Sequence, residues 1–290
     1  MDEIMLYRGC TTPVRLPNYE AATIAVLEKL GVKVRIMEDA NCCGAQYVES
    51  LSRNAYAAMS GRILALAEKE GLDVLAICGA CSGSLKVNKH YLDNNDEAKD
   101  ELNELLADED LEYSGTTRVR HLLQVFNEDI GFEKIGAAVI RPYNGLKLAA
   151  HYGCHVTRPG DIVQVDDPEE PTIIDDLISI VGATPVDYTG KTRCCGGPML
   201  AMDEGIATAI GQDKITNIKK AGAQGVVTAC VFCNVQLTQA QFSGEIDRSQ
   251  LLPTITLPQL LGPAIGIEDD ALGLALNRIS PETIMNTLGG

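Results

Sequence analysis

The ten cysteines of this 290-residue sequence form one pattern that occurs twice, with no cysteine left over. In each copy, a lone Cys is followed by an adjacent Cys-Cys pair, and a C-x2-C motif begins after another 34 residues. We call these sets the N-terminal frame, with Cys10, Cys42, Cys43, Cys78 and Cys81, and the C-terminal frame, with Cys154, Cys194, Cys195, Cys230 and Cys233. A repeat of this length indicates two copies of one structural unit. We therefore expect two domains, formed by residues 1–140 and 141–290.

Short β-rich runs alternate with helical patterns in both halves. Such runs precede the lone cysteines, at residues 4–9 and 148–153, and the C-x2-C motifs, at residues 74–77 and 226–229. Apolar residues with helical spacing lie between them, and several of these helical patterns end at a glycine. The alternation predicts an α/β fold. Each half should be a small, mainly parallel sheet with flanking helices, and pseudo-two-fold symmetry should relate the two halves.

The acidic segment 91–114 has no counterpart in the second half. Its apolar residues Ala98, Leu102, Leu105 and Leu106 recur with the spacing of one helical face. We therefore predict an inserted surface helix with one apolar stripe.

Composition narrows the class of protein. The net charge of −16 argues against a broad surface for nucleic acid or anionic membranes, because phosphate would be repelled. No apolar run reaches 18 residues, and the start Met1-Asp2-Glu3 lacks the features of a signal peptide. We expect a cytoplasmic protein that binds neither nucleic acid nor membrane. In that compartment, metal or redox chemistry is a better explanation for ten cysteines than structural disulfides.

Five thiols per half exceed the four that a structural zinc ion or an ordinary 4Fe–4S cubane requires. Adjacent side chains on a strand point to opposite faces, so each Cys-Cys pair needs a sharp turn, which Gly44 and Gly196 permit. Thiolates select zinc, copper(I) or iron–sulfur clusters, and zinc in one half stays an open alternative. A thioredoxin-like dithiol would explain one C-x2-C motif but not the duplicated frame.

The arrangement C-x(n)-CCG-x(n)-C-x2-C, present twice, resembles the cysteine-rich CCG-domain family over nearly the whole chain. One departure is the spacing of 34 residues before C-x2-C, which is one shorter than the family pattern in both halves. The resemblance implies two non-cubane 4Fe–4S clusters, each held by the five cysteines of one frame. It also implies the activity of a disulfide oxidoreductase that reduces the mixed disulfide of coenzyme M and coenzyme B.

All ten cysteines belong to the two frames, so electrons must come from another protein. The resemblance implies which proteins these are. The implied donors are a small ferredoxin-like subunit with 4Fe–4S clusters and a flavin-containing iron–sulfur subunit, and a hydrogenase is a further candidate. Two alternatives stay open. The chain could be the electron-transfer subunit of a lactate- or succinate-oxidising complex, or a non-catalytic subunit that only carries clusters.

Histidine and basic residues near the frames are candidates for roles in such a reaction. His151 and His155 bracket Cys154, and we predict that His155 donates a proton to a nascent thiolate. A buried or surface His with satisfied hydrogen bonds is the alternative. Arg8, Lys191 and Arg193 lie beside frame cysteines and are candidate contacts for the sulfonate and phosphate of the two coenzymes. These cations could instead offset the negative charge of the clusters.

Overall fold

Two four-stranded sheets form the centre of the molecule in the computed structural model, which describes residues 1–243 and 250–289. Their strand orders, β2-β1-β3-β4 and β6-β5-β7-β8, are equivalent, and every pair of neighbours is parallel. The strands are β1 Glu3–Tyr7, β2 Lys33–Ile36, β3 Val74–Ala76, β4 Val119–His121, β5 Lys147–His151, β6 Thr184–Pro185, β7 Gly225–Thr228 and β8 Thr254–Thr256. The predicted α/β class, with one parallel sheet in each repeat, is confirmed.

Helices cover these sheets. Those of the first half are α1 Thr12–Arg15, α2 Pro17–Lys29, α3 Ala45–Glu49, α4 Arg53–Lys69, α5 Gly79–Asp93, α6 Asp96–Leu106, α7 Leu122–Gln124 and α8 Phe132–Ala138. Those of the second half are α9 Cys154–Thr157, α10 Gly160–Val163, α11 Ile173–Ile180, α12 Glu204–Lys220, α13 Val231–Ala240, α14 Leu257–Ala264 and α15 Glu282–Met285. Short 3₁₀ turns lie at Ala107–Glu109, Gly197–Met199 and Leu274–Leu276, and a π-helical turn lies at Val125–Ile130. None of the helices formed by the described residues combines the length and the apolarity that crossing a membrane requires.

The strand order places a binding site in each half. From β1 the chain moves to β2 on one side and then to β3 on the other, so its direction reverses between β1 and β3. The equivalent reversal lies between β5 and β7. In open parallel sheets, ligands bind at this switch point, beyond the carboxyl ends of the strands. The lone cysteines and the C-x2-C motifs follow these four strands.

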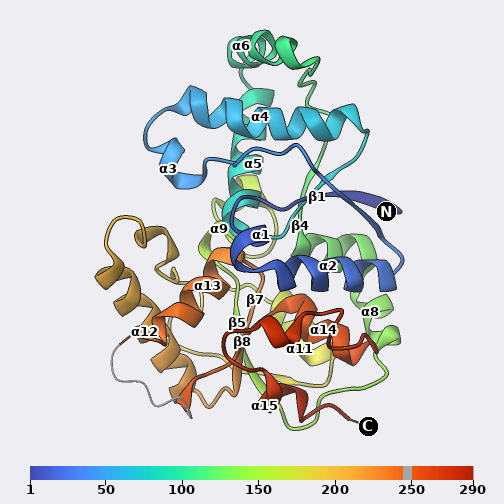
Figure 1. Cartoon of the computed structure of the whole chain (residues 1–290), viewed down its shortest axis with the longest axis vertical. Coiled ribbons are helices and arrows are strands. Elements are labelled where there is room, and N and C mark those ends of the chain that lie inside the picture. Colours follow the sequence, from blue (N-terminus) through green and yellow to red (C-terminus); the bar gives the residue numbers. More distant parts are fainter. Residues whose placement is uncertain (244–249, 290) are drawn as a thin grey trace.

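The two halves share one buried core. Helix α14 of the second half packs against α2 of the first, and α5 packs against α9, α10 and α13. Figure 1 shows α5 descending from the first half to meet α9 and α13 near the middle of the molecule. Because the switch points of both halves lie toward these central helices, the two frames come close together.

The inserted helix of the acidic segment is present as α6, at the end of the molecule farthest from the C-terminal half (Figure 1). Leu102 and Leu106 are buried, but Leu105 is 66% exposed, so only part of the apolar stripe faces the core. The helix is rotated so that Asn103 also faces inward. Its side chain accepts a hydrogen bond from the backbone N–H of Tyr113, at 2.8 Å, and donates to the carbonyl of the same residue. This polar contact turns Leu105 toward solvent.

Candidate metal centres

The N-terminal frame gathers at the carboxyl ends of β1, β2 and β3. Cys10 follows β1, the Cys42-Cys43 pair lies in the loop after β2, Cys78 is the N-cap of α5, and Cys81 lies in the first turn of that helix. The Sγ atoms of Cys10 and Cys42 are 3.7 Å apart, and those of Cys43 and Cys81 are 3.6 Å apart. Hydrogen bonds from the thiols of Cys42 and Cys81 lower the pKa of Cys43. Cys81 also hydrogen-bonds to Cys78, so the five thiols form one cluster.

The C-terminal frame has the same construction around β5, β6 and β7. Cys154 begins α9, and Cys230 is the N-cap of α13, as Cys78 is of α5. The thiols of Cys154 and Cys195 hydrogen-bond to Cys194 and lower the pKa of that thiol. Cys195 in turn contacts Cys233. The cysteines of each predicted frame thus lie close together in space, although they follow three different strands of the sheet.

Glycine makes the turn that each Cys-Cys pair needs. Gly44 has φ +79° and Gly196 has φ +90°, values that side-chain-bearing residues rarely adopt. The backbone N–H of Gly44 donates to Sγ of Cys42, at 3.4 Å, and that of Gly196 donates to Sγ of Cys194, at 3.3 Å. The turn therefore aims both sulfurs of a pair inward and supplies a donor that stabilises negative charge on one of them. This part of the prediction is confirmed.

The two frames touch each other. Sγ of Cys78 lies 3.8 Å from Sγ of Cys230, and both residues are buried. The approach depends on Gly79, because a Cβ atom at that position would meet Cγ2 of Val156 at 2.5 Å and Sγ of Cys230 at 3.5 Å. Sequence reasoning did not place the frames in contact, since spacing along the chain says nothing about packing between the repeats.

Two further buried side chains lie beside the thiols. His151 is fully buried, and one nitrogen of its ring lies within 4.8 Å of the sulfurs of both Cys195 and Cys233. Burial, and then the charge of Lys214, lower the pKa of His151 to about 3, against the smaller raising effects of Cys194 and of a backbone hydrogen bond at Lys191. The hydroxyl of Tyr19 on α2 is also buried and finds no hydrogen-bond partner among the described residues. Burial and then the nearby sulfurs of Cys230 and Cys78 raise its pKa. No sequence signal distinguished Tyr19, whereas the position of His151 near Cys154 was a weak one.

The predicted proton donor His155 lines a cavity. Its Nδ1 atom lies 3.4 Å from Sγ of Cys154. The cavity has a volume of about 430 Å³, and its walls come from α3, α4, α5 and α9, with Arg158 and Pro159 at one side. A second, smaller cavity is lined by His155 and by Cys154, Cys195, Cys230 and Cys233. A group in the larger cavity would therefore lie near both His155 and the C-terminal frame.

The predicted substrate-binding cations are not gathered in one place. Arg8 forms ion pairs with Glu20, at 3.3 Å, and with Glu38, at 3.7 Å. Lys191 pairs with Asp175 at 2.8 Å. Arg193 is exposed, and among residues 1–243 and 250–289 no carboxylate pairs with it. Their roles toward a substrate stay predictions, and of the three only Arg193 has an uncommitted guanidinium group.

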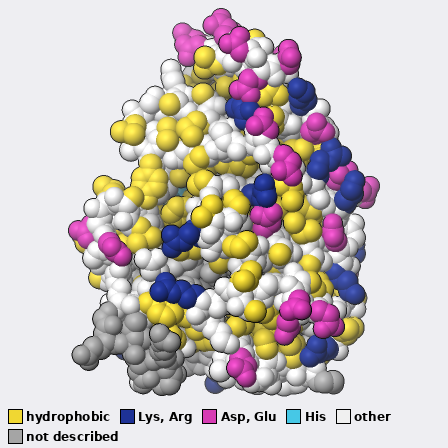
Figure 2. All heavy atoms as spheres, in the orientation of Figure 1, with side chains coloured by type: hydrophobic (Ala, Val, Ile, Leu, Met, Phe, Trp, Pro, Cys, Tyr) yellow, Lys and Arg dark blue, Asp and Glu magenta, His cyan; other side chains and the backbone are white. Residues whose placement is uncertain are grey.

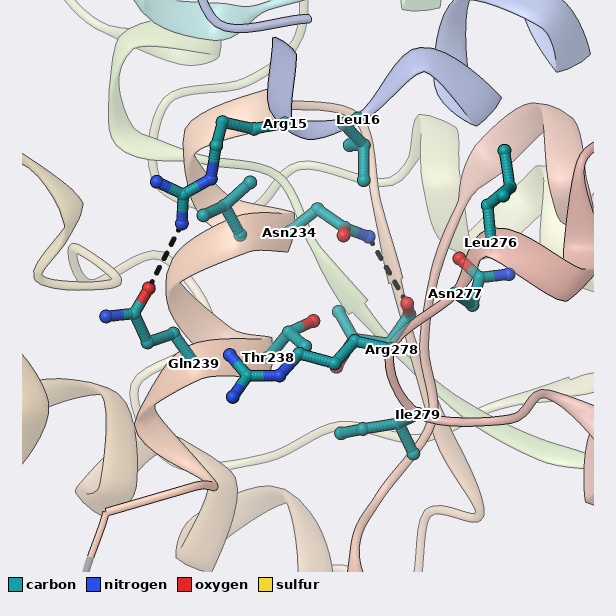
Figure 3. Close-up of a pocket in the computed structure, with 11 residues that line it drawn as sticks. Arg15, Leu16, Asn234, Thr238, Gln239, Leu276, Asn277, Arg278 and Ile279 are labelled. Atoms are coloured by element: carbon teal, nitrogen blue, oxygen red, sulfur yellow. Dashed lines mark hydrogen bonds between the residues drawn. The ribbon is translucent and has the colours of Figure 1, made fainter.

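A separate pocket of about 120 Å³ lies where α1 and α13 meet residues 276–279 (Figure 3). Arg15, which the sequence places near Cys10, points into this pocket and donates a hydrogen bond to Gln239 at 3.3 Å. Arg278 reaches along the other side of the pocket and stacks over the ring of Phe242, 3.9 Å from its centroid. None of the residues that line the pocket is a cysteine, so it is a feature separate from the two frames.

Comparison with known proteins agrees with this geometry. Residues 4–86 and 148–238 match the model of a family described as the CCG cysteine-rich domain. The chain therefore belongs to the cysteine-rich CCG-domain family and contains two copies of that domain.

Individual relatives are subunits of multi-subunit reductases. The chain is 34% identical to the subunit designated B in the ferredoxin/F420H2-dependent CoB-CoM heterodisulfide reductase of Methanosarcina acetivorans, over 96% of this chain and 94% of that protein. It is 32% identical to the corresponding subunit of the ferredoxin:CoB-CoM heterodisulfide reductase of Methanosarcina mazei, with the same coverage. It is also 32% identical to the 8-methylmenaquinol:fumarate reductase membrane anchor subunit of Wolinella succinogenes, over 96% of this chain and 97% of that protein.

A solved structure shares the fold. The crystal structure of a hypothetical protein from Helicobacter pylori superposes with a TM-score of 0.75 at 17% identity, over 95% of this chain and 51% of the other. At this identity the likeness concerns the fold alone.

Proposed function

We propose that this chain is the catalytic subunit that reduces the mixed disulfide of coenzyme M and coenzyme B to the two thiols. The observation that carries the proposal is the pair of five-thiol frames that meet at Cys78 and Cys230. The kinship with two heterodisulfide reductase subunits over almost the whole chain supports the choice of substrate.

The number of thiols favours non-cubane 4Fe–4S clusters, one in each frame. In an ordinary cubane, four cysteines serve four irons. Each frame gathers five thiols, and Sγ atoms of the N-terminal frame approach one another to 3.7 Å and 3.6 Å. Five converging thiols fit a cluster of lower symmetry.

The reaction consumes two electrons and two protons, and it breaks one S–S bond to give two thiols. Each bound cluster would supply one electron. The chain itself holds the two centres side by side through Cys78 and Cys230, which brings both within reach of one disulfide. His155 faces the cavity and donates a proton to the thiolate released there. Arg193 is the available cation for an anionic end of the substrate.

Electrons must enter from outside the chain, because no cysteine is left for a relay cluster. We propose a small ferredoxin-like subunit as the donor, supplied in turn by a flavin-containing iron–sulfur subunit and, in some assemblies, a hydrogenase. Three of the most exposed apolar side chains, Val14, Leu51 and Met202, each follow a frame cysteine closely in sequence. They suit the docking of such a partner near the frames. A cytoplasmic location stays a prediction.

A second candidate function has support of its own. The Wolinella succinogenes relative belongs to a fumarate reductase and is as similar as one of the heterodisulfide reductase subunits. The chain could therefore pass electrons within a complex of the succinate- or lactate-oxidising kind without reducing a disulfide itself.

Turnover by the isolated chain separates the two functions. Protein purified without oxygen should reduce the heterodisulfide with a reduced viologen as artificial donor. It should leave the homodisulfides of the two coenzymes largely unreduced. Full cluster content with no heterodisulfide turnover would favour the electron-transfer function and contradict the proposal.

A further inference from the structure

One buried lysine has no acidic partner. Among the described residues, the buried lysine and arginine side chains are those of Arg120 and Lys214. Arg120 forms ion pairs with Glu128, at 2.7 Å, and with Asp129, at 2.9 Å. Lys214, on α12, is 4% exposed, and no carboxylate within residues 1–243 and 250–289 forms an ion pair with it. Cationic side chains are rarely buried unless they are paired, so this ammonium group needs an opposite charge nearby.

The contacts that Lys214 does make are with neutral groups. Its Nζ atom donates a hydrogen bond to the backbone carbonyl of Gly190, at 2.6 Å. The same atom lies 5.5 Å from the centroid of the Tyr188 ring. These contacts fix the position of the ammonium group without cancelling its charge.

The face of α12 that bears Lys214 packs on the C-terminal frame. One turn earlier on that face, a Cβ atom at Gly211 would lie 3.6 Å from the backbone carbonyl oxygen of Cys195. The hydroxyl oxygen of Tyr188 lies 3.5 Å from Nδ1 of His151, a residue whose ring approaches two frame sulfurs within 4.8 Å. Burial lowers the pKa of Lys214 to about 8, against the raising effect of the frame sulfurs, so the amine is mostly protonated at pH 7.

The N-terminal half has no cation at the equivalent position. Helices α4 and α12 both have 17 residues, and each follows a capping residue, Ser52 or Asp203, whose side chain accepts a backbone hydrogen bond. When the helices are aligned from these caps, Lys214 corresponds to Ile63, which is fully buried. The buried ammonium group therefore belongs to one frame only.

We propose that the ammonium group of Lys214 is the counter-ion of the C-terminal centre and raises the reduction potential of that centre alone. Reduction adds one electron to a cluster that cysteine thiolates already make negative, and a fixed cation nearby stabilises the added charge. Because Lys214 is buried, salt screens this interaction only weakly. The inference rests on the iron–sulfur content that the proposed function gives to the frames.

Redox titration followed by EPR tests this role. Protein purified without oxygen is poised at a series of potentials with mediator dyes, and the C-terminal centre is identified as the signal that is lost in Cys195→Ser. In Lys214→Met, the midpoint potential of this centre should fall by at least 59 mV, which is a tenfold change in the ratio of reduced to oxidised cluster for one electron. The N-terminal centre should keep its midpoint potential.

Further variants separate charge from packing. Lys214→Arg keeps the charge and should change the same ratio by less than threefold. Ile63→Met, the matched change in the first repeat, should leave both midpoint potentials unchanged. If Lys214→Met does not fold, Lys214→Gln carries the same expectation, because its amide can still donate to the carbonyl of Gly190.

An unchanged C-terminal midpoint potential in the neutral variants of Lys214 would overturn the inference, and so would an equal fall in Lys214→Arg. None of these readouts requires disulfide turnover, and iron analysis shows whether the clusters are present. A chain without clusters would overturn both this inference and the proposed function. Clusters whose potentials do not respond to Lys214 would overturn this inference alone.

Discussion

At the scale of single residues, the structure separates side chains that are free to meet a substrate from those already engaged. Arg8 is held by Glu20 and Glu38, whereas Arg193 is exposed and has no carboxylate partner among the described residues. An uncommitted guanidinium group can form the bidentate contact that a sulfonate or phosphate offers. Neighbouring cations in the sequence are therefore not equivalent in the fold.

Arg193→Gln should raise the KM for the heterodisulfide by about ten- to a hundredfold, the equivalent of roughly 1.5–3 kcal/mol for a charge-assisted contact. Arg8→Gln should have a smaller effect, since its partners already neutralise the guanidinium group. Steady-state kinetics with an artificial donor gives both values, and iron analysis checks that cluster content is unchanged. Equal KM values for Arg193→Gln and wild-type protein would mean that Arg193 does not bind the substrate and instead offsets the negative charge of a cluster.

His155→Gln should lower kcat by about a hundredfold or more, because a positioned proton donor contributes at least that much. His155 is not one of the five frame cysteines, so we expect the variant to keep its cluster content. Its Nδ1 atom lies 3.4 Å from Sγ of Cys154, and the side chain lines the cavity. His90→Gln, on the exposed side of α5, is the matched control and should keep the wild-type kcat. An unchanged kcat in His155→Gln would remove the residue from the proposed mechanism.

At the scale of elements, periodicity in the sequence was sufficient to place strands and helices but not to orient α6. The glycines that end helical patterns and the turns at Gly44 and Gly196 follow from local backbone chemistry, which a sequence displays. The facing of Leu105 depends on the hydrogen bonds between Asn103 and the backbone of Tyr113. Those bonds depend on how the following segment folds back, which hydrophobic spacing does not encode.

Leu102→Ala should lower the free energy of unfolding by about 2–5 kcal/mol, as expected for a buried leucine. Leu102 is 3% exposed and packs so closely against Gly61 that a Cβ atom there would overlap its Cδ2. Leu105→Ala, in the same helix, should change the free energy of unfolding by no more than about 0.5 kcal/mol. Thermal unfolding of both variants, compared at equal cluster content, measures the two changes in stability. Similar losses of unfolding free energy in both variants would contradict the exposed position of Leu105.

At the scale of the whole molecule, two equivalent sheets bring their switch points together, and the contact between Cys78 and Cys230 joins the frames. Figure 2 shows acidic side chains at the end of the molecule that α6 forms and also along the right and lower parts of the same face, with apolar and basic side chains between them. The duplicated cysteine pattern predicted both frames, but neither their contact nor the burial of His151 beside Cys195 and Cys233, because these arise from packing between and within the repeats.

Gly79→Ala tests the contact between the halves. The added Cβ atom would meet Cγ2 of Val156 at 2.5 Å, and overpacking of this kind costs about 1–3 kcal/mol. We expect a lower melting temperature and an altered EPR signal from the C-terminal centre, although the change lies in the first repeat. Gly136→Ala in α8 is the control, because its nearest neighbour lies at 3.7 Å. A normal C-terminal signal in Gly79→Ala would mean that the halves adjust without disturbing the frames.

The central claim is that each frame holds an iron–sulfur cluster, and metal analysis of the chain tests it most directly. Protein purified without oxygen should contain about eight irons and eight sulfides per chain, as two four-iron clusters. Cys43→Ser and Cys195→Ser should each lose iron mainly from the frame that carries the change. A chain with four irons and one zinc ion would contradict the account by showing that one frame is a structural metal site.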